Sequence, residues 1–121
     1  MKIKNLVIIA IILSISVLTC FTTTQGLSYK QNNISSGQSK NDVMNILGMP
    51  GNKQFNGKNE AWQYCSTGLF TDNYVVVWFY DGTVTGMTTY SQSYGNGNCN
   101  KFFKSINWND APDKIIEIRN K

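Results

Sequence analysis

The residues of this chain with the greatest chemical potential are its three cysteines, because histidine is absent altogether. Without histidine there is no His-based triad and no imidazole general acid or base. The cysteines stand at positions 20, 65 and 99 and form no C-x-x-C pair, which disfavours both a thioredoxin-like redox site and a zinc site. The seven carboxylates are scattered, and neither a GxSxG elbow nor a P-loop occurs. We therefore expect no enzyme, no cofactor and no metal site.

Residues 1–19 have the pattern of an export signal. The first five residues carry two lysines, and residues 6–18 are apolar apart from two serines. A membrane-spanning helix needs about 20 apolar residues, which is more than this run supplies. A basic start, a short apolar run and a change to polar sequence are typical of a signal peptide. The alternatives are an uncleaved membrane anchor and a buried core helix.

The apolar run ends in SVLTC, which resembles the bacterial lipobox, where a peptidase cuts before a cysteine whose sulfur carries a diacylglycerol. Leu18 fits this pattern, whereas Thr19 stands where Gly, Ala or Ser is usual. The lipobox interpretation predicts a palmitate-bearing lipoprotein that begins at Cys20, with residues 20–33 as a flexible tether. Phe21, rather than Asp, then implies sorting to the periplasmic face of the outer membrane. The alternative is a cysteine lost with an ordinary signal peptide, which leaves a soluble periplasmic protein.

Lipidation of Cys20 would leave Cys65 and Cys99 as an even pair. In an oxidising compartment two thiols on one small domain tend to bond, so we predict a disulfide between them. A disulfide between them would close a loop of 35 residues, and the chain-entropy model gives such a cross-link a stabilisation of about 4 kcal/mol. The alternative is two independent buried cysteines.

The charge of the chain points to no nucleic-acid partner. The net charge is +4, but the basic residues are scattered singly along the sequence. Nucleic-acid binding domains usually carry a basic run or stripe, and this chain has neither.

A short capped helix is predicted immediately after the tether. Ser39 is a favourable N-cap residue, and Asp42 supplies an acid in the first turn. Gly48 suits the C-terminal cap, and Pro50 prevents the helix from continuing. The expected apolar stripe consists of Val43, Ile46 and Leu47. A helix of about eight residues is not stable alone, so this stripe must pack on another element.

Strand patterns follow the helix. Residues 60–66 alternate so that Trp62 and Tyr64 share one side, and residues 73–80 and 83–90 flank Asp81-Gly82, a strong hairpin signal. The faces of the first hairpin strand are Tyr74, Val76, Trp78 and Tyr80 on one side, and Val75, Val77 and Phe79 on the other. Both faces are apolar, which predicts a central strand covered on both sides.

The last part of the chain is less regular. Residues 91–98, SQSYGNGN, have the composition of binding loops, although a plain solvated connection explains them without a partner and is preferred. Residues 113–119 alternate apolar and charged side chains, which favours an edge strand over a short helix. We predict one α+β domain over residues 34–121, with a short helix or helices packed on a three- to four-stranded antiparallel sheet.

The helix region resembles the first motif of the SmpA/OmlA (BamE-type) family of small outer-membrane lipoproteins, G-x-[ST]-x-x-x-V-x-x-[IL]-L-G-x-P. The matching residues are Gly37, Ser39, Val43, Ile46, Leu47, Gly48 and Pro50. Trp62, Tyr64 and the FYDGTV hairpin at 79–84 look like the family's aromatic strand and hairpin, so the resemblance spans roughly residues 35–87. It implies helices on a three-stranded antiparallel sheet, a layout shared with β-lactamase-inhibitor-like proteins, and it makes the helix motif structural rather than catalytic.

The same resemblance implies a non-enzymatic scaffold in outer-membrane protein assembly or envelope integrity, anchored in the membrane by lipid and bound to other envelope proteins such as the assembly machine. The alternative is an exported protein-binding or inhibitory module with a periplasmic partner. The residues predicted to form a partner surface are Trp62, Tyr64, Trp78, Tyr80 and Tyr94. A competing prediction is that the tail folds back over the second sheet face through Phe102, Phe103, Ile106 and Trp108.

Overall fold

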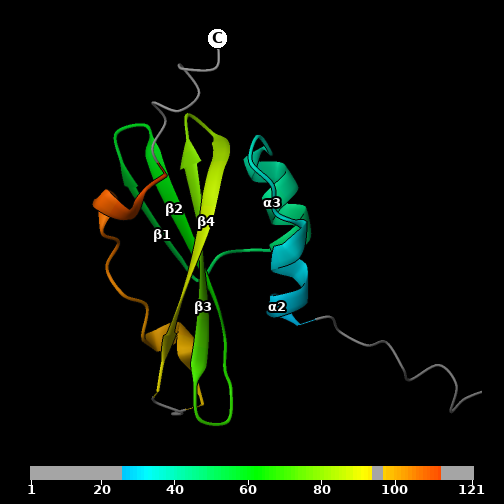
Figure 1. The fold of residues 1–121 in the computed structure, drawn as a ribbon, viewed down its shortest axis with the longest axis vertical. Helices are drawn as coiled ribbons and strands as arrows, with labels where there is room; N and C mark the ends of the chain where they lie inside the picture. The colour runs from blue at the N-terminus through cyan, green and yellow to red at the C-terminus, as the bar shows by residue number, and fades with distance from the viewer. Residues whose placement is uncertain (1–25, 94–96, 113–121) are drawn as a thin grey trace, which may run out of the picture.

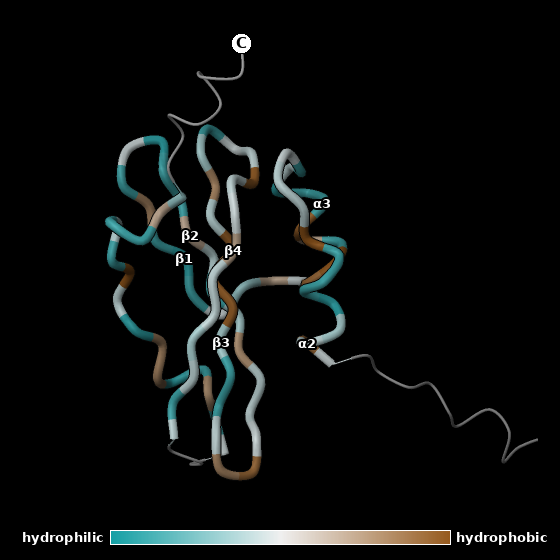
Figure 2. The backbone as a smooth tube through the Cα atoms, in the orientation of Figure 1, coloured by the Kyte–Doolittle hydropathy of each residue, from teal (hydrophilic) through white to brown (hydrophobic). Residues whose placement is uncertain are grey.

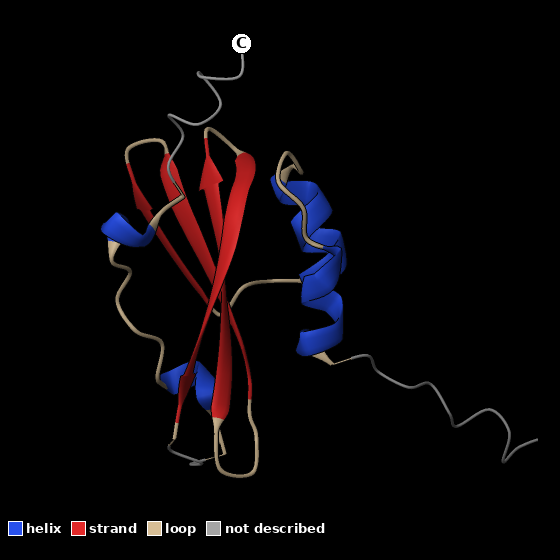
Figure 3. Ribbon diagram, viewed as in Figure 1, coloured by secondary structure: helices blue, strands red, loops and turns tan. Residues whose placement is uncertain are grey.

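The computed structural model describes residues 26–93 and 97–112, and it has the predicted α+β fold (Figure 1). The predicted signal peptide, Cys20, Tyr94 and the predicted edge strand at 113–119 lie outside the described residues. Two helices pack on one face of a four-stranded sheet, and the tail with its two short 3-10 helices crosses the other face (Figure 3).

The sheet is an antiparallel meander in the order β1-β2-β3-β4. Its strands are β1 (Asn52–Asn56), β2 (Asn59–Ser66), β3 (Asp72–Tyr80) and β4 (Thr83–Gln92). The turn between β3 and β4 is the predicted one, with φ of 49° at Asp81 and 81° at Gly82. Both central residues therefore have positive φ, as a type I′ hairpin turn requires. The edge strand β1 was not predicted from the sequence.

Helix α3 (Lys40–Leu47) confirms the predicted caps. The Ser39 hydroxyl accepts from the Asp42 amide at 3.1 Å, and the Asp42 carboxylate accepts from the Ser39 amide at 2.9 Å, which completes a capping box. Gly48 ends the helix with φ of 80°, a conformation that favours glycine. The packed stripe is Val43, Met44 and Leu47 rather than the predicted set with Ile46.

The domain begins earlier than predicted, which corrects the interpretation of residues 20–33 as one flexible tether. Helix α2 (Leu27–Lys30) continues into the 3-10 turn η1 (Gln31–Asn33), and Leu27 packs against the core beneath α3. This stretch is short and mostly polar, so the sequence shows no amphipathic pattern there, and Leu27 is its residue that packs on the core.

Two hydrophobic clusters hold the layers together, one on each face of β3. The helix-face cluster consists of Val43, Trp62, Tyr64, Val75, Val77, Phe79 and Val84. The tail-face cluster consists of Ala61, Val76 and Trp78, with Tyr90, Ile106, Trp108 and Ala111 packed on them. The alternation along β3 thus places successive residues in opposite clusters, which confirms the prediction of a strand covered on both sides.

Candidate functional site

The structure buries most of the aromatic residues that were predicted to form a partner surface. Trp62 is 3%, Tyr64 5% and Trp78 3% exposed, so an exposed surface made of these three side chains is wrong. Tyr80 is 38% exposed at the end of β3, and Tyr94 lies outside the described residues. The five residues are also not on one face, because Trp62 and Trp78 belong to different clusters.

Trp62 and Tyr64 are held on the helix face by polar contacts as well as packing. The Trp62 indole N–H donates to the Glu60 carboxylate at 2.7 Å, and the Phe79 ring lies 4.7 Å away between centroids. The Tyr64 hydroxyl donates to the Gly48 carbonyl at 2.9 Å, which fastens the end of α3 to β2. Burial raises the pKa of the Tyr64 hydroxyl, so it remains a donor. Both aromatics therefore act as core residues.

The tail covers the other face, which confirms the competing prediction for Ile106 and Trp108. The Trp108 ring meets Trp78 edge-on, with 6.0 Å between centroids, and Ile106 packs in the same cluster. Phe103 meets Tyr74 edge-on at 5.6 Å, whereas Phe102 remains 41% exposed.

A buried polar network fixes the middle of the tail. Gln63 is 0% exposed in the centre of β2. Its amide nitrogen donates to the Lys104 carbonyl at 2.8 Å and to Asn52 Oδ1 at 3.1 Å. Its amide oxygen accepts from the Tyr90 hydroxyl at 2.7 Å, and that hydroxyl accepts from the Lys104 amide at 3.1 Å. These bonds use both donors of the buried amide and give its oxygen a partner, so the network is structural.

The predicted disulfide is present between Cys65, near the end of β2, and Cys99, in the 3-10 helix η2 (Cys99–Lys101). The Tyr74 hydroxyl donates to the Cys99 carbonyl at 3.1 Å, and the Cys99 amide donates to Thr67 Oγ1 at 3.3 Å. Burial raises the pKa of the Tyr74 hydroxyl, which keeps it protonated as a donor. The start of the tail is thus fixed to the end of the sheet that carries the β2–β3 loop.

That loop, residues 67–71, carries exposed apolar residues that sequence reasoning missed. Leu69 is 84% and Phe70 78% exposed. Figure 2 shows this apolar segment at the lower end of the molecule. The available signal was an apolar pair placed directly after Thr67-Gly68, between two strong strand patterns, where turn residues are usually polar.

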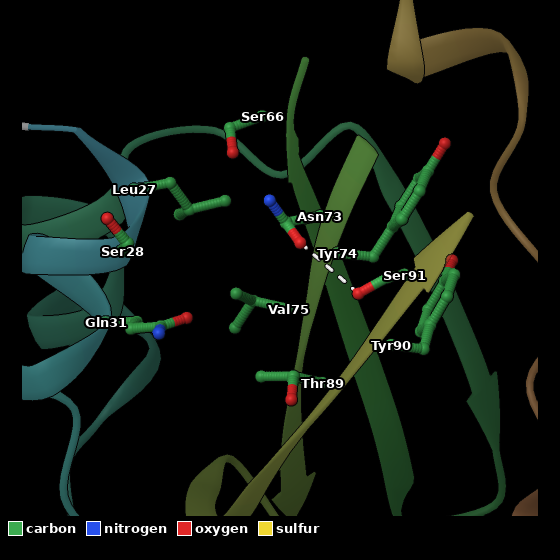
Figure 4. A pocket seen from close by; sticks show the side chains of 10 residues that line it. All are labelled: Leu27, Ser28, Gln31, Ser66, Asn73, Tyr74, Val75, Thr89, Tyr90 and Ser91. Carbon is green, nitrogen blue, oxygen red and sulfur yellow. Dashed lines mark hydrogen bonds between the residues drawn. The ribbon is translucent and has the colours of Figure 1, made fainter. Parts of the chain in front are cut away.

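A hollow of about 340 Å³ lies between α2 and the same end of the sheet (Figure 4). Leu27 and Gln31 face Val75 and Thr89 across the hollow. At its edge the Ser91 hydroxyl donates a hydrogen bond to Asn73 Oδ1. Its lining holds amide and hydroxyl groups but no carboxylate, lysine or thiol, so it offers hydrogen bonds and shape rather than acid–base or nucleophilic chemistry.

Within residues 26–93 and 97–112, no three potential metal ligands cluster together, and none of the helices has the length and apolar character that a bilayer span needs. Asp72 is 1% exposed, and its Oδ1 atom has no hydrogen-bond partner within the described part of the chain. One such carboxylate does not make a site.

Comparison of the chain with protein-family models, with curated proteins and with solved structures finds no match.

Proposed function

We propose that this chain is an exported, lipid-anchored protein of the bacterial envelope that works as a small non-enzymatic scaffold in outer-membrane assembly or envelope integrity. Its partners are other envelope proteins and the membrane, and it acts through surfaces rather than through a reaction. The anchor is Cys20, on the periplasmic side of the outer membrane.

The observation that carries this proposal is the Cys65–Cys99 bond in a chain that begins with an export-signal pattern. Disulfides persist mainly in oxidising compartments, so a cross-linked small domain supports export. Pairing of these two residues leaves Cys20 as the odd cysteine, in the position that a lipoprotein requires. The capped helix packed on an antiparallel sheet is also part of the layout that the SmpA/OmlA resemblance implies, although the sheet has four strands where that layout has three.

A second candidate function is an exported inhibitory module that binds one periplasmic protein. Leu69 and Phe70 favour this function, because they are exposed apolar residues on a loop that the disulfide constrains. Residues of this kind often fill a pocket on a partner protein.

Co-purification after cross-linking in intact cells separates the two candidates. The protein is extracted in mild detergent and its partners are identified by mass spectrometry, with Phe55→Ser as a matched surface control. The scaffold predicts several membrane-associated assembly proteins in the eluate, and the inhibitor predicts one soluble periplasmic protein. An eluate without any enriched envelope protein contradicts both.

A further inference from the structure

Exposed apolar residues concentrate at the end of the molecule that carries loop 67–71. Besides Leu69 and Phe70, Phe102 follows η2 at this end and Tyr29 lies on α2. Large apolar side chains left in water cost free energy unless something covers them, so a cluster at one end indicates a contact surface.

The loop is held in one shape. The disulfide joins the strand before the loop to η2, and the Thr67 hydroxyl is bonded to the Cys99 amide. At Gly68 a Cβ atom would lie 2.2 Å from the Thr71 carbonyl oxygen, so the tight turn requires glycine. Leu69 and Phe70 are therefore presented together by a constrained loop, and docking them costs little ordering entropy.

The described carboxylates, unlike the lysines, are unevenly distributed over the domain: Lys40, Lys53 and Lys58 lie with the carboxylates at the end opposite loop 67–71, and Lys40 pairs with Glu60 there. Four carboxylates of the described residues are exposed or half-buried. Asp42 lies in the first turn of α3, Glu60 and Asp81 lie at the upper ends of the strands, and Asp110 lies in the 3-10 helix η3 (Trp108–Asp110). The half of the domain that carries loop 67–71 presents Lys30, Lys101 and Lys104, and its described carboxylate, Asp72, is buried. Exposed apolar residues on the half of the domain whose described carboxylate is buried suit an anionic surface.

The chain also enters the domain at this end. Leu27 lines the same hollow as Ser66 and Asn73, which flank the loop on β2 and β3 (Figure 4). Cys20 lies seven residues before Leu27, and a fully extended chain of that length spans at most about 25 Å. A lipid on Cys20 would therefore keep this end of the domain close to the bilayer surface.

We propose that loop 67–71 is a membrane-contact loop, which inserts Leu69 and Phe70 into the headgroup region of an anionic bilayer, while Lys30, Lys101 and Lys104 on the same half of the domain attract the lipid phosphates. This inference rests on the proposed lipid anchoring, which it extends by giving the domain a second attachment point and a fixed orientation. The diacylglycerol on Cys20 would carry two acyl chains and anchor the chain by itself, so the apolar loop and the basic residues would mainly set how the domain lies on the membrane.

The test uses the mature chain, residues 20–121 with Cys20→Ser and with the disulfide formed, so that vesicle binding reports on the loop without the lipid and without the apolar residues 6–18. Sedimentation with phosphatidylcholine vesicles, with and without phosphatidylglycerol, measures binding. We expect binding to the anionic vesicles and at least a tenfold loss in the Leu69→Ser, Phe70→Ser double variant. Phe55→Ser removes a side chain that is 80% exposed on β1 and serves as the matched control, with binding unchanged. Lys101→Gln should weaken binding, whereas Lys58→Gln, at the acidic end, should not.

Insertion depth gives a second readout. With Phe70→Trp, brominated lipids should quench the added fluorescence, and with Phe55→Trp they should not. Equal vesicle binding by the double variant and its parent, or no binding to any vesicle, overturns the membrane-contact loop. So does loss of a co-purified protein in the double variant without any vesicle binding, because the loop then docks on protein. Fractionation of Cys20→Ser in cells tests the anchor separately, so failure of the anchor and failure of the loop give different results.

Discussion

Tyr90→Phe removes one oxygen atom from the network that docks the tail on the sheet. The phenol donates to Gln63 Oε1 at 2.7 Å and accepts from the Lys104 amide at 3.1 Å. The stacking of the Tyr90 ring on Tyr74, with 4.5 Å between centroids, is retained by phenylalanine. Lys104 is exposed and its amide can turn to water, but Gln63 is 0% exposed and its oxygen cannot.

The expected cost follows from that difference. A buried acceptor left without a donor costs about 1–3 kcal/mol, and each kcal/mol lowers the melting temperature of a domain of this size by about 4–8 °C. Thermal and urea unfolding with the disulfide intact measure the loss. Tyr29→Phe, at a residue that is 57% exposed, is the control and should stay within about 0.5 kcal/mol of the parent. If Tyr90→Phe is as stable as this control, the tail is not docked through Gln63.

Three further predictions address the other constraints. Cys99→Ser should lower the free energy of unfolding by about 2–5 kcal/mol in urea titrations. Peptide mapping of the parent protein without reductant should find Cys65 joined to Cys99, and two alkylatable thiols would exclude the disulfide. Trp108→Ala should destabilise by about 2–4 kcal/mol in the same titrations, because half-buried Trp108 packs on Trp78, and an unchanged midpoint would mean that the tail is not core. Hydrogen bonds from the Ser39 backbone and side chain lower the pKa of the Asp42 carboxyl below 3.8. The stabilisation from these bonds is therefore complete above pH 3.8 and is lost as the pH falls through the folded-state pKa. Ser39→Ala should cost about 1 kcal/mol and move the pKa of Asp42 toward 3.8 in an NMR titration, and an unmoved pKa would refute the capping box.

The features that the sequence predicts well are those with local causes. The caps of α3 depend on Ser39, Asp42 and Gly48, which lie within one short segment, and the hairpin turn depends on two adjacent residues. The two-faced burial of β3 follows from strict alternation of side chains along a strand. The disulfide is predicted by counting cysteines in a chain with an export-signal pattern, without reference to the fold.

The features that the sequence does not predict depend on distant partners. Strand β1 is a short polar edge strand whose sequence, NKQFN, has no apolar alternation, and it forms because β2 offers it hydrogen bonds. Leu27 becomes a core residue only where α2 meets the sheet. The prediction that Trp62 and Trp78 are exposed was wrong, because each side chain is covered by an element far away in the chain. Trp62 is covered by α3 and Trp78 by the tail. The exposure of Leu69 and Phe70 depends on how the loop between β2 and β3 folds, which a two-residue apolar pair does not determine.

The most direct test of the central claim is the chemical state of the N-terminus in the exported protein. Mass spectrometry of the protein from its native membrane, compared with Cys20→Ser, measures both cleavage and lipidation. The proposal predicts a mature chain that begins at Cys20 with a thioether-linked diacylglycerol, and release of Cys20→Ser into the soluble fraction. A mature chain that begins after Cys20, or an identical distribution of the two proteins between membrane and soluble fractions, would contradict it.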